Sequence, residues 1–359
     1  MYPLKRRCPV IRIVLVVEWR PCQSPPVGNV KFHRLAASAL LAFGLCGCLS
    51  LDPGLEDPRT GPFSPEEVEA FYGRAQDPRT FWLTIYENQQ GPTFRGSHRL
   101  HAGQFTELPF KTPKKTSSVP VVSVETFRLS RIFALVDTSS ANNWMSIQEA
   151  SRSTVTPLSP PAFRTRAEHV NDPVDGYLGH IDNLKLKTLR IESVLAFVRG
   201  SWDGLEVVER GVEKPVPGMV LGMQFLKPFA FVQFDFESRA VRFSADQGYR
   251  PDKKILLASV PFRSGSGPLQ VAGTINGKPQ EIILDTAGSF DVVLPSKTEG
   301  ILRHLSIGDL VLRDLTISPD ATVQGTFSQP RVGLGILSQF LMTLDSKNKV
   351  VHFERSTPP

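Results

Sequence analysis

The stretch Leu135-Val-Asp-Thr-Ser-Ser-Ala-Asn-Asn-Trp144 decides the fold of this chain, because Leu284-Asp-Thr-Ala-Gly-Ser-Phe-Asp-Val-Val-Leu-Pro295 repeats its pattern. Each run is an apolar strand that delivers Asp-Thr into a turn of small residues and then returns to an apolar strand. Two carboxylates, Asp137 and Asp285, therefore occupy equivalent points in two similar halves. Chemistry in which two carboxyl groups share one proton requires such an arrangement.

Two hairpin blocks recur in the same order around these turns. Residues 119–136 and 268–284 both predict a β-hairpin that leads into the Asp turn, and Asn276-Gly277 is a strong signal for a two-residue hairpin loop. Residues 184–191 and 305–312 alternate between apolar and polar side chains, as hairpin strands do. The body of the chain is therefore predicted to be an internal duplication.

A third block completes the repeat. Val220-Leu-Gly222 pairs with Gly333-Leu-Gly335, and each is followed by a Phe-Leu pair, Phe225-Leu226 and Phe340-Leu341. Each half then ends in a strand hairpin in which an Asp precedes a Phe by eight residues. The hairpin residues are Asp235 and Phe243 in the first half, and Asp345 and Phe353 in the second. Three blocks in register predict two lobes of the same topology.

The two halves differ in length at one place. Asp137 and Leu184 are 47 positions apart, whereas Asp285 and Leu305 are 20 positions apart. The additional residues of the first half predict a long loop beside a shared cleft, where a lid can develop. A surface insertion without a function is the alternative.

The charge of the chain is concentrated at its N-terminus. The net charge is +6, but residues 1–47 hold seven Lys or Arg and one acid, and the rest is balanced at 34 of each sign. The folded part therefore carries no basic footprint for nucleic acid. All four cysteines precede residue 49, so the body has no internal disulfide and no thiolate metal site. Its length suffices for two lobes with sizeable cores.

The N-terminus is predicted to be a lipoprotein signal peptide. Lys31-Phe-His-Arg34 is a basic start, and residues 35–47 form an apolar run that is too short to span a bilayer. The run ends in Leu45-Cys-Gly-Cys48, which resembles the bacterial lipobox, and Cys48 is the predicted lipidated residue. An ordinary cleaved signal peptide is the alternative.

The remaining boundaries follow from composition. Ser64-Pro-Glu-Glu67 predicts the start of a helix that runs to about Arg74, and residues 81–86 predict a strand. Residues 87–118 are polar and basic, which favours a solvated linker over an inhibitory pro-segment. The predicted organisation is a leader and signal peptide at 1–47, a tether at 48–63, an N-terminal extension with one short helix at 64–118, a first lobe at 119–250 and a second lobe at 251–359. Residues 1–29 fit no signal-peptide pattern, so translation is predicted to begin at Val27 or Val30.

These motifs resemble the pepsin/retropepsin superfamily of aspartic peptidases. The run from Asp137 to Trp144 resembles the family's first Asp-Thr-Gly-Ser-Ser segment, and Asp285-Thr-Ala-Gly-Ser289 resembles the second. Val220-Leu-Gly222 and Gly333-Leu-Gly335 resemble the apolar-apolar-Gly strand beneath each Asp loop. The resemblance covers roughly residues 119–354. It implies an all-β, bilobal fold with two similar β-barrel-like lobes and the cleft between them.

The resemblance also implies a role for each residue of the two turns. Asp137 and Asp285 would be the catalytic carboxylates, one ionised and one protonated, with a water held between them. The residues expected to support these loops are Thr138 and Thr286, through cross-lobe hydrogen bonds, and Ser139, Ser140, Ala287 and Gly288, through backbone N–H groups aimed at the carboxylates. Tyr177, in the insertion of the first half, is the candidate flap residue.

The sequence departs from the family's pattern at the residue after each Asp-Thr. The family has Gly there because backbone, carboxylate and water crowd together, whereas this chain has Ser139 and Ala287. A Cβ in each loop can displace the carboxylates, and catalysis is sensitive to small displacements. This departure leaves two alternatives open, an active enzyme and an inactive relative.

The predicted function is aspartic endopeptidase activity on extended peptides, with peptide or protein substrates and a lipid-anchored location in a bacterial cell envelope, at the outer membrane. A catalytically inactive relative that binds peptides or an envelope protein is the main alternative, and a purely structural lipoprotein is another. No cofactor and no metal are expected, since the seven histidines show no metal-binding spacing.

Overall fold

The computed structural model describes residues 73–356, apart from 82–83, 89–90, 96–97, 112–117, 127–130, 154, 159–163, 167–172, 200–217, 264, 266, 296–298 and 319–328. The predicted signal peptide, Cys48, the tether and the start of the helix at Ser64 lie outside these residues. No helix within the described ranges is long and apolar enough to cross a membrane.

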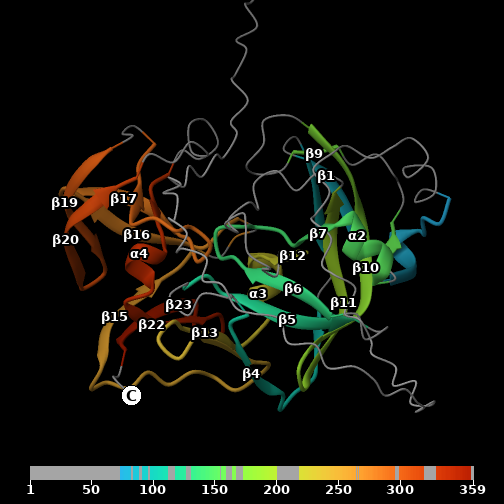
Figure 1. The fold of residues 1–359 in the computed structure, drawn as a ribbon, viewed down its shortest axis with the longest axis horizontal. Helices are drawn as coiled ribbons and strands as arrows, with labels where there is room; N and C mark the ends of the chain where they lie inside the picture. Colours follow the sequence, from blue (N-terminus) through green and yellow to red (C-terminus); the bar gives the residue numbers. More distant parts are fainter. Residues whose placement is uncertain are drawn as a thin grey trace, which may run out of the picture. The chain divides into compact units, whose positions relative to one another are not determined.

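The described chain is an all-β protein with two lobes, as predicted (Figure 1). Its α-helices among the described residues have six, four and four residues. They are too short to form a layer of their own, so the strands carry the architecture.

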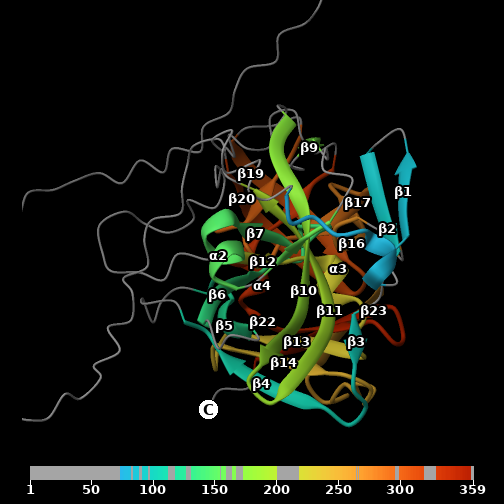
Figure 2. The same cartoon turned by 90° about the vertical axis from the view of Figure 1, so that its right-hand side faces the viewer.

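The first lobe is a nine-stranded sheet whose central strands close into a ring. The order is β3-β11-β7-β12-β6-β5-β10-β8, with β9 beside β10, and the pairing of β10 with both β5 and β11 closes six strands on themselves. Figure 2 shows the long strands β10 and β11 side by side. The elements are β3 (Arg99–Leu100), β5 (Val121–Thr126), β6 (Arg131–Val136), β7 (Trp144–Ser146), α2 (Ile147–Arg152), β8 (Thr156–Pro157), β9 (Arg164–Arg166), β10 (Pro173–Leu186), β11 (Leu189–Arg199) and β12 (Met219–Leu221).

The second lobe repeats this ring as a closed barrel in the order β16-β17-β21-β18-β20-β19. Asn276 and Gly277 have φ of 50° and 79°, which confirms the tight hairpin turn predicted from this dipeptide. The predicted hairpin at 305–312 is β19–β20, in which Ile307 pairs with Leu310. The strands are β16 (Gln270–Ile275), β17 (Lys278–Leu284), β18 (Val292–Val293), β19 (Gly300–Ile307), β20 (Leu310–Ile317) and β21 (Arg331–Val332).

A six-stranded sheet joins the lobes, in the order β15-β23-β22-β13-β14-β4. The two terminal hairpins predicted from the sequence meet there, because β13 pairs with β22 and Gln233 lies opposite Thr343. The Gln233 amide nitrogen donates to Thr343 Oγ1 at 3.0 Å. The strands are β4 (Phe105–Pro109), β13 (Phe231–Asp235), β14 (Ala240–Ser244), β15 (Leu256–Pro261), β22 (Phe340–Asp345) and β23 (Val350–Arg355).

The N-terminal extension adds one strand to the sheet of the first lobe and one to the six-stranded sheet. The prediction of a solvated linker at residues 87–118 is therefore wrong for most of the residues that the structure describes there. β4 adds to β14, and its buried Thr106 and Leu108 alternate with exposed residues. β3 adds to β11, and η1 (Pro78–Phe81) precedes a hairpin of β1 (Thr84–Asn88) and β2 (Gly91–Arg95). The predicted strand at 81–86 therefore begins later, at Thr84.

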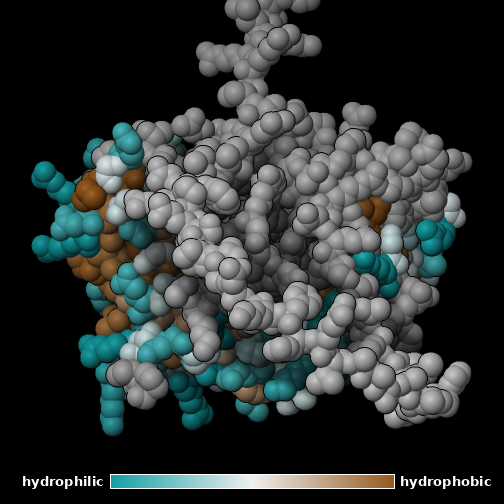
Figure 3. Space-filling model, viewed as in Figure 1, coloured by the Kyte–Doolittle hydropathy of each residue, from teal (hydrophilic) through white to brown (hydrophobic). Residues whose placement is uncertain are grey.

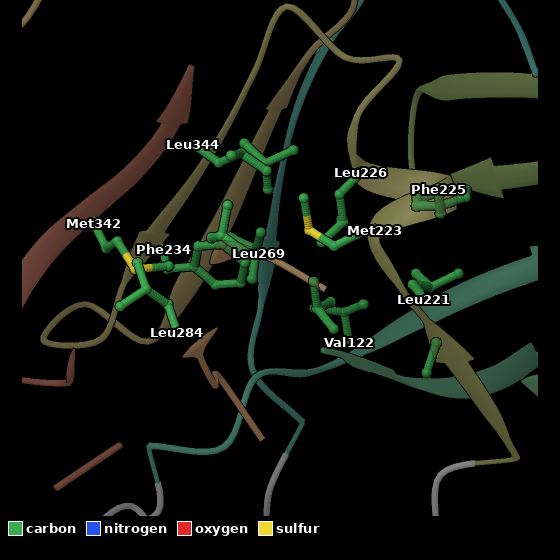
Figure 4. Close-up of a cluster of buried hydrophobic side chains, with 14 of the residues drawn as sticks. Val122, Leu221, Met223, Phe225, Leu226, Phe234, Leu269, Leu284, Met342 and Leu344 are labelled. Atoms are coloured by element: carbon green, nitrogen blue, oxygen red, sulfur yellow. The ribbon is translucent and has the colours of Figure 1, made fainter. Parts of the chain in front are cut away.

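Buried apolar side chains from both lobes form one continuous core. It contains side chains of the first half such as Leu221 and Met223, and of the second half such as Leu284, Met342 and Leu344 (Figure 4). Apolar groups also reach the surface of the second lobe (Figure 3). Ile301 of β19 and Val311 of β20 are 55% and 50% exposed. The shared core makes the two lobes one packed unit.

Candidate active site

The two Asp turns sit at equivalent places in the two rings. Asp137 follows β6 and Asp285 follows β17. Each aspartate is held by the strand that runs parallel to its own. The Asp137 N–H donates to Leu221 O of β12 at 3.0 Å, and the Asp285 N–H donates to Val332 O of β21 at 2.9 Å. The backbone therefore presents both carboxylates in the same way.

A glycine ends each supporting strand because the Asp loop passes directly over it. Gly222 begins α3 (Met223–Leu226), and a Cβ on it would lie 2.2 Å from Asn142 O. Gly333 begins α4 (Leu334–Leu337), and a Cβ on it would lie 2.5 Å from Phe290 O. Any side chain at either position would push the Asp loop away.

This geometry corrects the third block of the predicted repeat. Val332 pairs with Leu284 as Leu221 pairs with Val136, so the counterpart of Gly222 is Gly333 and not Gly335. The second supporting strand is therefore Arg331-Val-Gly333, with an arginine at the position that Val220 occupies in the first lobe. Because this strand does not place two apolar residues before its glycine, the repeat pattern does not reveal it. The Phe-Leu pairs are not equivalent either, since Phe225 lies in α3 and Phe340 begins β22.

The two Asp loops are joined by a reciprocal set of hydrogen bonds between Thr138 and Thr286. The Thr138 N–H donates to Thr286 Oγ1 at 3.1 Å, and the Thr286 N–H donates to Thr138 Oγ1 at 3.2 Å. Each hydroxyl also donates across the lobes, Thr138 to Leu284 O at 2.6 Å and Thr286 to Val136 O at 2.8 Å. Both threonines are fully buried. The cross-lobe hydrogen bonds predicted for this pair are present, and they tie the carboxylates to one rigid base.

Asp137 lies in surroundings that disfavour its charge. It is 7% exposed, and its Oδ1 accepts from the Ser139 N–H at 2.7 Å and from the Ser139 hydroxyl at 2.8 Å. Burial first, and the charge of Asp285 second, raise the pKa of Asp137 to about 7, against the opposing effects of Ser139 and Arg331. The charge of one carboxylate thus acts on the other, as a shared-proton pair requires.

Asp285 differs from Asp137 in that an arginine is among the donors that contact it. It is fully buried, and its Oδ1 accepts from the N–H groups of Ala287 and Gly288, both at 2.9 Å. Its Oδ2 is ion-paired with the guanidinium of Arg331, which is itself 6% exposed. All of these contacts favour the ionised carboxylate.

The structure shows what replaces the expected glycines after each Asp-Thr. The Ser139 hydroxyl bonds to Asp137, so the added side chain supplies a donor. Ala287 packs against an apolar cluster that includes Trp144 and Phe197. One residue later the loop needs a glycine, because a Cβ on Gly288 would lie 2.2 Å from the Phe290 ring and 2.9 Å from Asp285 Oδ2.

The predicted support residue Ser140 and the candidate flap residue Tyr177 differ from Ser139, Ala287 and Gly288. The Ser140 hydroxyl donates to Asn142 O at 2.8 Å and accepts from Trp144 Nε1 at 3.2 Å. The Ser140 carbonyl oxygen accepts from the Met223 N–H at 2.8 Å, so Ser140 braces the turn. Tyr177 lies within β10 opposite Val198, and its side chain lies outside what the structure describes.

Among the described residues, Ser259, His352 and Asp345 lie near one another but do not form a hydrogen-bonded triad. Ser259 Oγ lies 2.9 Å from His352 Nδ1, but His352 Nε2 is 3.7 Å from Asp345, beyond hydrogen-bond length. The oxygens of Asp345 already accept from Asn348, at 2.9 Å and 2.7 Å, as expected of a turn carboxylate. His98 is buried with its pKa lowered to about 4, and no metal-binding group of His, Cys, Asp or Glu occurs in the described ranges.

No protein-family model and no curated protein matches this chain.

Proposed function

We propose that this chain is an aspartic endopeptidase of the pepsin/retropepsin type. The observation that carries the proposal is the pair of aspartate turns from two equivalent lobes, locked together by the Thr138–Thr286 hydrogen bonds. The charge of Asp285, which contributes to raising the pKa of Asp137, supports it, since two carboxylates that share one proton are the working group of this chemistry.

The proposed reaction uses a water held between the carboxylates. The ionised aspartate takes a proton from the water as the water oxygen attacks the carbonyl carbon of the peptide bond. The protonated aspartate gives its proton to the carbonyl oxygen. When the C–N bond breaks, the leaving nitrogen takes the proton held by the first aspartate, and the second recovers its own.

The proposed substrate is an extended peptide. Both lobes are sheets, and a peptide in extended form can bond to strand backbones on either side of the carboxylates. If Cys48 is lipidated, the enzyme acts on peptides or proteins at the bacterial envelope. A mature protein with a lipid-bearing Cys48 at its N-terminus, seen by mass spectrometry, would support that location, and an unmodified end elsewhere would contradict it.

Cleavage of a peptide library at acid and neutral pH tests the proposal. The wild type is expected to cut, whereas Asp137→Asn and Asp285→Asn are expected to lose at least 10³-fold in rate, on the order of what removing one essential acid–base group costs. Asp309→Asn, in the exposed turn between β19 and β20, is the matched control and should cut normally. Cleavage that survives in both active-site variants would refute the enzyme.

One observation favours the alternative of an inactive peptide-binding protein. The ion pair between Arg331 and Asp285 engages an oxygen of one carboxylate, and the family pattern has an apolar residue at that position. Under this alternative the wild type binds library peptides without cutting any of them, and Asp137→Asn binds equally well. Peptide binding followed by mass spectrometry of the bound fraction separates the two functions.

A further inference from the structure

Arg331 breaks the symmetry between two matched strands. Its counterpart Val220 is 4% exposed and belongs to an apolar cluster with Trp144 and Phe197. Arg331 instead places a buried guanidinium against Asp285, with its Cζ 5.4 Å from the centre of the Phe290 ring. In such buried, apolar surroundings the attraction between the two charges is strong, and either charge alone would destabilise the folded state.

The balance of charge around the two aspartates depends on this arginine. Among the described residues, the charges that act on Asp137 are those of Asp285 and Arg331. With one shared proton, the three groups sum to zero, which is the least costly state for buried groups. Without the arginine, the same protonation state would leave a buried net negative charge, and a second proton would bind more readily.

We propose that Arg331 is a positioning residue that fixes the negative charge of the pair on Asp285, so that Asp137 holds the shared proton. This assignment rests on the proposed function for its catalytic meaning. Asp285 then takes the proton from the attacking water, and Asp137 gives its proton to the carbonyl oxygen. The arginine also opposes the binding of a second proton by the pair, because that state would leave a buried net positive charge.

The experiment that tests the proposal is a pH titration of the two carboxyl groups by carbon-13 NMR, with aspartate labelled at Cγ. Asp137→Asn and Asp285→Asn assign the two signals. In the wild-type chain, Asp285 is expected to remain ionised through the range in which Asp137 gains its proton. If Asp285 gains its proton at higher pH than Asp137, the assignment is overturned, and this holds without any variant of Arg331.

Variants of Arg331 test the cause. Arg331→Val, which copies the first lobe, should raise the midpoint of Asp285 by more than about one pH unit, the effect of losing a cation at this range. Arg331→Lys keeps the charge and should restore most of the shift even if the valine variant folds poorly. Unchanged midpoints in folded Arg331→Val, or in Arg331→Gln, would show that the arginine does not set the charge.

The titration tests the charge assignment, and the cleavage assay tests the proposed function, so either claim can be refuted without the other. If the midpoints behave as expected but no peptide is cut, the charge assignment stands and the proposed function falls. If peptides are cut, the acid limb of the pH–rate profile should move to higher pH by more than about one unit in Arg331→Val, with Arg331→Lys close to wild type. A limb that does not move in the valine variant would contradict the role of Arg331.

Discussion

Folding raises the pKa of Asp137, so the stability of the protein depends on the charge of this residue. In the folded chain it keeps a proton up to a pKa of about 7, whereas the unfolded chain releases it near pH 4. The folded state therefore holds one more proton between these values. The stability of the folded state therefore falls as the pH rises through this window, because the buried carboxyl of Asp137 must then ionise.

Asp137→Asn should remove this pH dependence. The free energy of unfolding of the variant, relative to that of the wild type, should be higher at pH 8 than at pH 4 by on the order of 2–4 kcal/mol. Urea unfolding at both values measures the difference, with Asp309→Asn as the control. Curves for wild type and Asp137→Asn that stay parallel would show that the carboxyl is not held protonated.

The threonine pair makes a second prediction for single residues. Thr138→Val keeps the shape of the side chain but leaves Leu284 O and the Thr286 N–H without the partners that Thr138 now provides. A loss of about 2–4 kcal/mol is expected from two buried groups of this kind, and Thr138→Ser should lose much less.

The double variant is the control for that assignment. Because Thr138 and Thr286 belong to one network, Thr138→Val and Thr286→Val together should cost less than the sum of the two alone. Additive losses in denaturant unfolding would mean that the hydroxyls act separately and do not join the lobes.

The elements that hold the site depend on two glycines. Gly222→Ala and Gly333→Ala would each bring a methyl group within 2.2–2.5 Å of a carbonyl oxygen of the Asp loop. Each should lower the stability by on the order of 2–4 kcal/mol, as overpacking against backbone does. Gly265→Ala is the matched control, because a Cβ there has no atom within 4 Å. If all three alanine variants unfold at the same denaturant concentration as the wild type, the close packing beneath the loops is absent.

Some strands could be predicted from the sequence and others could not. Local signals were sufficient for the hairpins, because Asn276-Gly277 and the alternation at 305–312 depend on neighbours along the chain. The strand β4 was missed because Phe105–Pro109 is a short edge strand, and its partner β14 lies more than 130 residues away in sequence. Its own alternation, with Thr106 and Leu108 buried, was the only available signal.

The site itself was predicted only in part, for a physical reason. Asp137, Asp285 and the two threonines lie in turns whose residue pattern is local and therefore visible. Arg331 becomes visible only when β21 is aligned through its pairing with β17, which is a contact of long range. An alignment on Gly222 and Gly333 would have placed the arginine opposite Val220.

At the scale of the whole molecule, the six-stranded sheet and the shared core make the two lobes interdependent. Strands β13 and β22 come from different halves of the chain, and all five residues of β13 pair with β22. The lobes are therefore expected to unfold together. Leu344→Ala, at a fully buried position of β22, should cost about 2–5 kcal/mol and lower the single melting transition by several degrees.

Calorimetry checks this cooperativity. Val311→Ala, at a half-exposed position of β20, removes a similar apolar group outside the core and should leave the melting temperature within about one degree of the wild type. Two separate transitions, of which Leu344→Ala shifts only one, would show that the lobes fold independently.

The most direct test of the central claim is the pKa of Asp137 measured in the wild type and in Asp285→Asn. The two aspartates come from different lobes, so a shift can arise only if the fold brings them together. The wild-type pKa should lie near 7 and should fall by more than about one unit when the charge of Asp285 is removed, since that charge contributes to raising it. A pKa of Asp137 that is the same in both proteins would mean that the two carboxyl groups do not form one site.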